Sequence, residues 1–168
     1  MIIVVEGIDR VGKTTLCNKL SNELNIPIYK HSQRVMDYSN MDNTNETDKM
    51  LHLLDVCKLL NADIIFDRFH LSDYVYGIIE RRYDAKNAAL NLSMLDDMLY
   101  EMNAILVFIS PTDIKSSSDQ HGKDLTPYFK LMTKVKHESK MRLFSCDYNS
   151  INDVVERIKE IYDEKSSL

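Results

Sequence analysis

The 168-residue sequence has no tryptophan, three prolines and four glycines. Chains that form collagen repeats or stay disordered are rich in glycine, proline or both, so this composition excludes those classes. No long hydrophobic run is present either: the apolar stretch at residues 1–5 is far shorter than the roughly 20 residues that cross a membrane. We therefore expect a soluble, cytoplasmic protein with no membrane partner.

Basic residues are also in the minority, and the formal net charge is -5 at pH 7. Proteins that coat nucleic acid usually carry a basic patch, so we expect no nucleic-acid partner. The three cysteines, Cys17, Cys57 and Cys146, are far apart and follow no metal-ligand spacing. They are expected to be reduced and partly buried thiols.

The sequence does contain alternating strand and helix patterns along most of its length. Strands are predicted at residues 2–6, 27–29, 63–67, 105–109 and 144–147. Helices are predicted at residues 13–24, 46–60, 71–82, 86–102, 127–143 and from 151 onward, after an N-cap at Ser150, with residues 165–168 frayed. Residues 31–45 are predicted to be a loop, and residues 114–126 a mobile, lid-like loop. Such alternation predicts a mainly parallel sheet with helices on both faces.

The clearest motif lies between the first strand and the first helix. It reads Gly7-Ile8-Asp9-Arg10-Val11-Gly12-Lys13-Thr14 and matches G-x-x-x-x-G-K-[ST] at every fixed position. In such a loop, backbone N–H groups and the helix N-terminus surround a phosphate. Lys13 is expected to reach the β- and γ-phosphates, and the Thr14 hydroxyl to bind Mg²⁺. ATP would be bound by these eight residues and Thr15.

This motif makes the expected fold a P-loop NTPase: a three-layer α/β/α domain with a central, mainly parallel five-stranded sheet. At this length, residues 1–168 are expected to form a single P-loop kinase domain. A GTP switch is disfavoured because no Asn-Lys-x-Asp motif follows a late strand. Asp119 and Gly122 do spell Asp-x-x-Gly, but in a loop after the fourth strand, and we interpret this match as chance.

The third predicted strand ends in Asp67 and Arg68. An aspartate here can hold Mg²⁺ through water, and a neighbouring arginine can bind an acceptor phosphate with two parallel hydrogen bonds. The pair therefore favours a kinase that acts on a small molecule.

Four segments together resemble the thymidylate kinase family. Residues 5–15 (VEGIDRVGKTT) resemble its opening, and residues 67–76 (DRFHLSDYVY) are similar to its D-R-[YH]-x-x-S-x-x-x-[YF] segment. Residues 31–34 (HSQR) resemble its F-P-x-R element, and residues 50–54 (MLHLL) lie where the family has a His-Leu-Leu-Phe helix. The order and spacing agree across most of the chain.

The resemblance implies an ATP-dependent nucleoside monophosphate kinase with Mg²⁺ as cofactor. It would transfer the γ-phosphate of ATP to a deoxynucleoside monophosphate, dTMP or a related deoxypyrimidine nucleotide, to give the diphosphate. Lys13 and Thr14 would bind the triphosphate and metal, and Asp67 would support the metal. Arg10 would be the catalytic arginine of the class that carries it in the P-loop, since residues 114–126 contain Lys115 and Lys123 but no arginine.

On the acceptor side, the resemblance implies five residues. Arg34 and Arg68 would clamp the acceptor phosphate, Asp9 would approach the deoxyribose 3′-hydroxyl, and Tyr76 would pack against the sugar. Phe69 would also bind the acceptor. The helix at residues 71–82 is compatible with a homodimer surface, as in the family, and the small size suits a virus-encoded form that acts in the host cytoplasm.

Three positions depart from the family. Without gaps, its base-stacking Phe aligns with Asp55 and its base-reading Arg with Leu59, and Gly77 replaces the Gln that commonly follows the Tyr. A shifted alignment, or stacking by Phe69 and His70, would preserve pyrimidine recognition. The sequence leaves these possibilities open.

Two other functions remain as alternatives. A deoxynucleoside kinase has the same fold, but its hydroxyl acceptor benefits from a general base. Residues 29–34 offer Lys30 and Arg34 and no carboxylate, which leaves Glu6 and Asp9 as candidate bases. A non-catalytic nucleotide-binding regulator would be expected to have lost the metal aspartate or the catalytic arginine, and Asp67 and Arg10 are both present.

Overall fold

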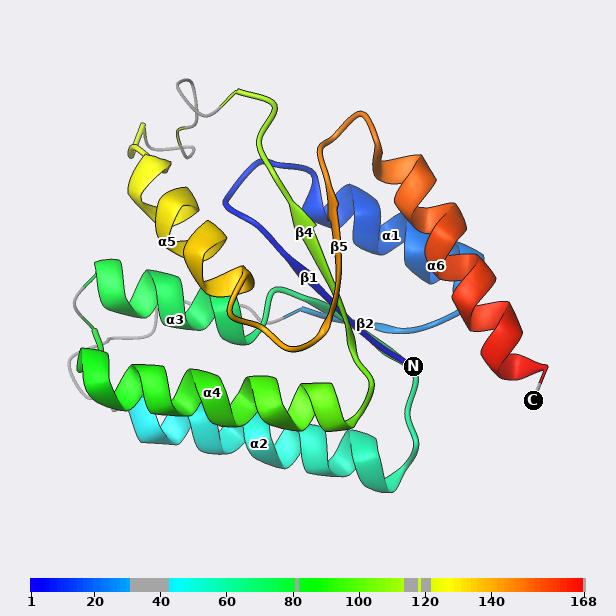
Figure 1. Cartoon of the computed structure of the whole chain (residues 1–168), viewed down its shortest axis with the longest axis horizontal. Helices are drawn as coiled ribbons and strands as arrows, with labels where there is room; N and C mark the ends of the chain where they lie inside the picture. The colour runs from blue at the N-terminus through cyan, green and yellow to red at the C-terminus, as the bar shows by residue number, and fades with distance from the viewer. Residues whose placement is uncertain (31–42, 81, 114–117, 119–121, 168) are drawn as a thin grey trace.

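The computed structural model describes residues 1–30, 43–80, 82–113, 118 and 122–167, and it has a five-stranded, all-parallel sheet at its centre (Figure 1). The strands are β1 (Ile2–Glu6), β2 (Ile28–Lys30), β3 (Ile64–Asp67), β4 (Ile105–Ile109) and β5 (Arg142–Cys146), in the spatial order β2-β3-β1-β4-β5. Every residue of β1 and β4 is buried, as expected for apolar strands covered on both faces. The fold is the predicted P-loop NTPase α/β/α arrangement.

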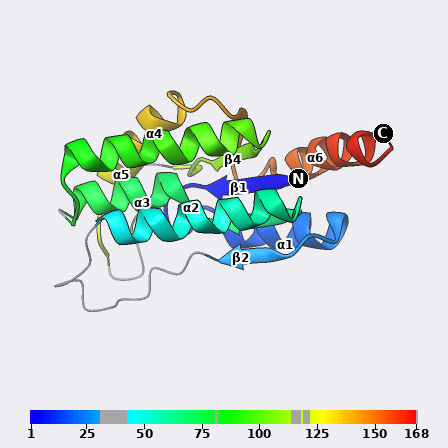
Figure 2. The same ribbon diagram turned by 90° about the horizontal axis from the view of Figure 1, so that it is seen from below.

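Within the described residues, six helices flank the sheet. On one side α1 (Lys13–Leu24) packs against α6 (Ile151–Ser166), as Figures 1 and 2 show. On the other side α3 (His70–Ile79) packs against both α4 (Ala85–Glu101) and α5 (Thr126–Lys136). The remaining helix, α2 (Asn43–Leu59), packs against α4. In the described part of the chain, no helix combines the length and apolarity needed to cross a membrane.

Most of the predicted elements are confirmed. The bounds of β1, α1 and β4 agree with the prediction, and the three cysteines are free and buried. The predicted loop at 31–45 is wrong at its end, because α2 begins at Asn43, while residues 31–42 lie outside the described residues. The predicted fraying at residue 165 is also wrong, because α6 continues to Ser166. Mobility of the 114–126 loop stays a prediction, since most of that segment is likewise not described.

The largest error concerns the helix predicted to run to residue 143. In the structure α5 ends at Lys136, and β5 begins at Arg142. The connection is held by Asp96 of α4, which accepts hydrogen bonds from Ser139 Oγ (2.6 Å) and from the Lys140 backbone N–H (3.0 Å). Contacts with a distant helix therefore override a local sequence that favours helix.

The end of α3 and the cap at the beginning of α6 also differ from the prediction, in both cases for local reasons. The helix predicted at residues 71–82 ends at Ile79, because the backbone N–H groups of Arg82 and Tyr83 both turn back to the Gly77 carbonyl (2.9 and 3.3 Å). Ser150 does occupy the N-cap position of α6, but its side chain makes no capping hydrogen bond. Its hydroxyl lies 3.0 Å from an Asp147 carboxylate oxygen instead.

Candidate active site

The candidate site lies where the strands of the parallel sheet end. The P-loop follows β1, Lys30 ends β2, Asp67 ends β3, and Tyr148 lies just beyond β5. Parallel strands bring their carboxyl ends to one edge of the sheet, and ligands of α/β proteins bind there. Residues far apart in the sequence therefore meet around the P-loop.

Two glycines allow the P-loop to fit into this edge. Gly7 has φ 150°, and a Cβ at this position would lie 2.6 Å from the Ile109 carbonyl oxygen of β4. Gly12 is the N-cap of α1 in a left-handed conformation, with φ 100°. A Cβ at Gly12 would lie 2.7 Å from Cδ2 of Tyr148. A side chain at either position would therefore collide with backbone or with an aromatic ring, as well as strain the turn.

Lys13 points into the P-loop at the start of α1. Its side chain is buried, and its ammonium donates a 2.5 Å hydrogen bond to the Ile8 carbonyl. Burial lowers the pKa of Lys13 to about 8, although the carboxylates of Asp67 and Glu6 partly offset this effect. A buried cation attracts a phosphate more strongly than a cation in water does.

Thr14 and Asp67 lie close together beside Lys13. The Thr14 hydroxyl donates a 3.3 Å hydrogen bond to Asp67 Oδ2, and the Lys30 ammonium is 4.0 Å from the same oxygen. Within the described residues, no group of three or more His, Cys, Asp or Glu side chains could hold a metal ion. A hydroxyl with one buried carboxylate nevertheless fits Mg²⁺, which in triphosphate sites takes its other ligands from phosphates and water.

The proposed acceptor residues Asp9, Arg68 and Tyr76 form one connected group. Arg68 donates a hydrogen bond to Asp9 Oδ1, and the Tyr76 hydroxyl donates one of 3.2 Å to Asp9 Oδ2. The Arg68 guanidinium also lies over the Tyr76 ring, 5.4 Å from its centroid. Burial raises the pKa of Tyr76, so its hydroxyl remains a donor near neutral pH. This group carries a cation, a carboxylate and an aromatic ring suited to a phosphorylated sugar.

Two other expected acceptor residues lie elsewhere. The Phe69 ring is fully buried and stacks on Phe66 at a centroid distance of 4.4 Å. His70 is also buried, with 1% exposure. Neither ring has a free face on which a base could stack, so we leave both out of the proposed acceptor site. Arg34 lies outside the described residues.

Arg10 is exposed on the P-loop and adopts φ 65°, a left-handed conformation that is uncommon for residues other than glycine. Lys123, the described lysine of the lid-like segment, is bound elsewhere. Its ammonium donates a 2.8 Å hydrogen bond to Glu80 Oε1 at the end of α3 and lies 4.6 Å from the centroid of the Tyr128 ring. Arg10 therefore provides a positive charge within the P-loop itself, whereas the Lys123 ammonium is bound to Glu80.

Two adjoining pockets surround these residues. The first, about 480 Å³, extends from Lys13 and Thr14 past Asp67 to Arg68. The second, about 600 Å³, extends from Val11 to Pro111 and Asn149, in the loops after β4 and β5. Asp9, Arg10 and Tyr148 line both pockets. The residues of the P-loop therefore lie at the junction of two spaces, each large enough for part of a nucleotide.

Two residues of this region were missed by sequence reasoning. Tyr148 is 56% exposed, and its ring covers Gly12. Its position just after the last strand was the available signal, since that edge of the sheet binds ligands. Glu6 was considered as a general base, but it is fully buried and binds the first turn of α3. No sequence pattern indicated this contact.

The departures from the thymidylate kinase pattern have structural counterparts. Leu59 is 85% exposed and Asp55 is also exposed, so the ungapped alignment does not place these positions in a base pocket. A Cβ at Gly77 would lie 2.0 Å from Cδ2 of Tyr83. The Tyr83 ring thus occupies the space that a side chain at position 77 would need, and its hydroxyl donates a 2.8 Å hydrogen bond to Asp73.

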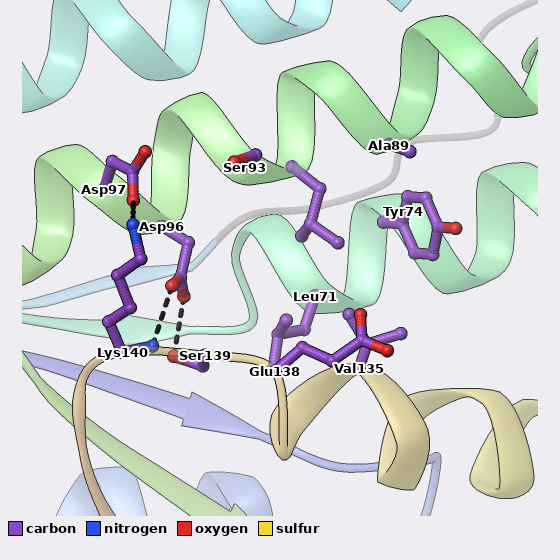
Figure 3. Close-up of a pocket in the computed structure, with 11 residues that line it drawn as sticks. Leu71, Tyr74, Ala89, Ser93, Asp96, Asp97, Val135, Glu138, Ser139 and Lys140 are labelled. Carbon is purple, nitrogen blue, oxygen red and sulfur yellow. Dashed lines mark hydrogen bonds and ion pairs between the residues drawn. The ribbon is translucent and has the colours of Figure 1, made fainter.

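A separate cavity of about 170 Å³ lies between α3, α4 and the turn that precedes β5 (Figure 3). Leu71 and Val135 provide its apolar side, and Lys140 forms an ion pair with Asp97 at its rim (2.5 Å). It shares no lining residue with the two pockets around the P-loop. The candidate active site is therefore confined to the ends of the strands.

No protein-family model matches the sequence, and a search of curated proteins finds no match. Among solved structures, the chain is similar to the YorR protein from Bacillus subtilis in complex with phosphorylated GDP, with a TM-score of 0.76 and 23% identity over 99% of this chain and 98% of that one. For thymidylate kinase from Ehrlichia chaffeensis the TM-score is 0.60 and the identity is 16%, over 96% of this chain and 97% of that one. For deoxyadenosine kinase from M. mycoides with the products dCMP and dCDP bound, the TM-score is 0.55 and the identity is 17%, over 98% of this chain and 99% of that one. At these identities the similarity shows a shared fold alone.

Proposed function

We propose that this protein is an ATP-dependent nucleoside monophosphate kinase that phosphorylates a deoxynucleoside monophosphate, with dTMP or a related deoxypyrimidine nucleotide as the acceptor. One observation carries the proposal: Lys13 of the P-loop and Arg68, just after β3, line the same pocket together with Asp67. A single pocket with a cationic group for each of two phosphates suits transfer between two anions brought end to end.

The chemistry would depend mainly on charge neutralisation. Lys13 would bind the β- and γ-phosphates, and Arg10, at the junction of the two pockets, would stabilise charge on the phosphoryl group in transfer. Thr14 and Asp67 would hold Mg²⁺, which supplies further positive charge at the phosphates when bound. Tyr148 and the second pocket offer space for the donor base.

On the acceptor side, Arg68 would bind the 5′-phosphate together with Arg34. In the structure Arg68 is paired with Asp9, so an incoming phosphate would compete with that carboxylate for the guanidinium. Asp9 would then be free to accept a hydrogen bond from the 3′-hydroxyl of the sugar. A phosphate with a second pKa of about 6 is already an anionic nucleophile near neutral pH, and it needs these cations more than a base.

A deoxynucleoside kinase is the main alternative, and the position of Glu6 weighs against it. Glu6 is 0% exposed and its carboxylate accepts hydrogen bonds from three backbone N–H groups and one hydroxyl. A group saturated in this way is poorly suited to accept a proton from a substrate. Asp9, which is bound to Arg68 and Tyr76, is left as the candidate base for that reaction.

The test is a panel of nucleosides and nucleoside monophosphates assayed with ATP and Mg²⁺. The proposal predicts ADP formation with a deoxypyrimidine monophosphate and none with the matching nucleoside. Phosphorylation of nucleosides alone would establish the alternative. ATP binding without turnover for every acceptor would indicate a nucleotide-binding regulator.

A further inference from the structure

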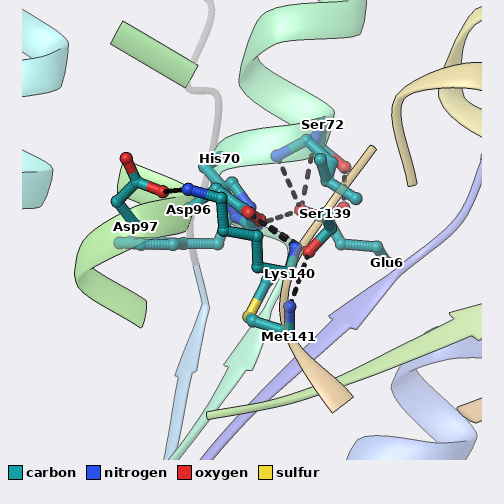
Figure 4. A network of polar contacts seen from close by, with 10 residues as sticks. Glu6, His70, Ser72, Asp96, Asp97, Ser139, Lys140 and Met141 are labelled. Atoms are coloured by element: carbon teal, nitrogen blue, oxygen red, sulfur yellow. Dashed lines mark hydrogen bonds and ion pairs between the residues drawn. The ribbon is translucent and has the colours of Figure 1, made fainter. Parts of the chain in front are cut away.

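Glu6, the last residue of β1, holds the beginning of α3. Its Oε1 accepts hydrogen bonds from the backbone N–H groups of Phe69 (2.9 Å), Leu71 (3.2 Å) and Ser72 (3.2 Å). Its Oε2 accepts a hydrogen bond from the Ser72 hydroxyl. Figure 4 shows the Glu6 carboxylate directed at this first helical turn. The Glu6 side chain is fully buried.

The helix needs this external partner. The first N–H groups of an α-helix have no acceptor within the helix, and a polar N-cap side chain usually provides one. The N-cap of α3 is Phe69, whose side chain makes no capping hydrogen bond. Glu6 supplies the missing acceptor from a different element, and its negative charge is favourable at a helix N-terminus.

Arg68 comes immediately before this turn. It has φ 69°, and residues other than glycine keep a left-handed conformation only where their surroundings enforce it. Its own N–H donates a 3.0 Å hydrogen bond to the Val5 carbonyl of β1. Consecutive residues of β1, Val5 and Glu6, thus hold the backbone on both sides of Arg68, and the same strand continues directly into Gly7 of the P-loop.

We propose that Glu6 is a positioning residue whose carboxylate fixes the first turn of α3 and so sets the location of the Arg68 guanidinium relative to the P-loop. The inference rests on the proposed function, since the acceptor phosphate is the group that Arg68 would bind. Glu6 itself contacts neither substrate. Glu6 is fully buried, and under this proposal its effect on turnover passes through Arg68.

A matched control acts on the same helical turn through a different contact. Asp96 of α4 lies 3.3 Å from Nε2 of the buried His70 and also binds Ser139 and Lys140 (Figure 4). Asp96 thus contacts a side chain of the first turn, whereas Glu6 holds the backbone next to Arg68. A variant at Asp96 loosens the packing of α3 without touching the contacts that fix Arg68.

The kinetic test compares Glu6→Gln, Arg68→Ala, the double variant and Asp96→Asn, with the acceptor monophosphate varied. Misplacement of a substrate-binding group can reduce rates by roughly 100-fold, so Glu6→Gln should lower kcat/KM for the acceptor by about 10- to 100-fold while the Kd for ATP stays within about twofold. In the Arg68→Ala background, Glu6→Gln should have almost no further effect. Multiplicative losses in the double variant, or an equal loss of kcat/KM in Asp96→Asn, would overturn the proposal.

Hydrogen exchange tests the same contact without reference to activity. Glu6→Ala removes the acceptor, so the amides of Phe69, Leu71 and Ser72 should exchange about tenfold or more faster than in the wild-type protein. Should Glu6→Ala fail to fold, Glu6→Gln is measured in its place, with a smaller change in the same direction. Unchanged protection of these amides contradicts the positioning role even if the wild-type protein proves active. Conversely, a wild-type protein inactive on every acceptor defeats the proposed function, while the exchange result still decides whether Glu6 holds this turn.

Discussion

The guanidinium of Arg68 donates a hydrogen bond to the carboxylate of Asp9, which joins the end of β3 to the P-loop. Asp9 also accepts a hydrogen bond from the Tyr76 hydroxyl. The cation proposed to bind the acceptor phosphate is therefore neutralised by a residue of the donor site. A ligand that binds Arg68 must compensate for the loss of this pair.

Replacement of Asp9 tests the role proposed for this carboxylate. The wild-type enzyme should prefer a deoxynucleoside monophosphate over its 3′-deoxy analogue by about 10- to 100-fold, because a hydrogen bond to a charged group contributes about 1.5–3 kcal/mol. In Asp9→Ala this preference should fall to about twofold or less, as measured by the ratio of kcat/KM values. A preference that survives unchanged in Asp9→Ala places the sugar elsewhere.

Lys13→Ala should abolish turnover, because the β- and γ-phosphates lose the buried cation at the start of α1. Lys19→Ala on the same helix is the control, since Lys19 is exposed and its ammonium donates a hydrogen bond to Asn152 of α6. ATP binding by calorimetry and ADP formation should both be lost in the first variant and retained in the second. Activity like that of the wild type in Lys13→Ala removes the P-loop assignment.

Arg10→Ala should lower kcat by roughly 10³-fold while ATP still binds, if Arg10 stabilises the transferring phosphoryl group as an arginine finger does. Lys123→Ala is the comparison, because the Lys123 ammonium is bound to Glu80 at the end of α3. Its kcat should stay close to that of the wild type. The opposite pattern, with the large loss in Lys123→Ala, would assign the catalytic charge to the lid-like segment, and a change confined to KM in Arg10→Ala would make Arg10 a binding group only.

The affinity for ATP should depend on pH through Lys13. Burial lowers the pKa of this ammonium to about 8 in the free protein, and a bound triphosphate raises it again. Below pH 8 the ammonium is charged with and without ligand, so the affinity should change little. Above it, binding requires uptake of a proton, and the Kd should rise by up to about tenfold per pH unit. Calorimetry at alkaline pH in buffers of different ionisation enthalpy measures that proton directly, and binding without proton uptake is the contrary result.

Gly77→Gln tests why this position lacks the glutamine of the resembled family. The new side chain would meet the Tyr83 ring, so the variant should lose about 1–3 kcal/mol of stability by overpacking. Gly77→Gln with Tyr83→Ala should lose less than the sum of the two single variants, because the ring that causes the clash is gone. Thermal unfolding provides the measurement. Additive losses would mean that Tyr83 does not define this space.

The parts of the fold that sequence could predict are those set by local chemistry. The apolar run of β1, the glycines of the P-loop and the leucine spacing of α1 define those elements without reference to the rest of the chain, and their bounds were right. The end of α5 was wrong because Asp96, distant in sequence, binds Ser139 and Lys140. No local pattern carries that information.

The same division applies to the candidate site. The structure brings Lys13 and Thr14 of the P-loop next to Asp67, the residue expected at the end of the third strand to support the metal. Phe69 was proposed to stack on the acceptor base, but its ring is fully buried and stacks on Phe66 in the core. The contact of Glu6 with the first turn of α3 was missed because three of its four hydrogen-bond donors are backbone N–H groups, which leave no trace in the sequence.

The most direct test of the account is a crystal structure with a bisubstrate analogue that joins adenosine to a deoxypyrimidine nucleoside through a polyphosphate chain. The account predicts that one end of the chain lies in the P-loop against Lys13, that Arg68 has left Asp9 for the phosphate of the other end, and that Asp9 faces the 3′-hydroxyl. A structure in which Arg68 remains paired with Asp9 while the second nucleoside binds elsewhere would contradict it.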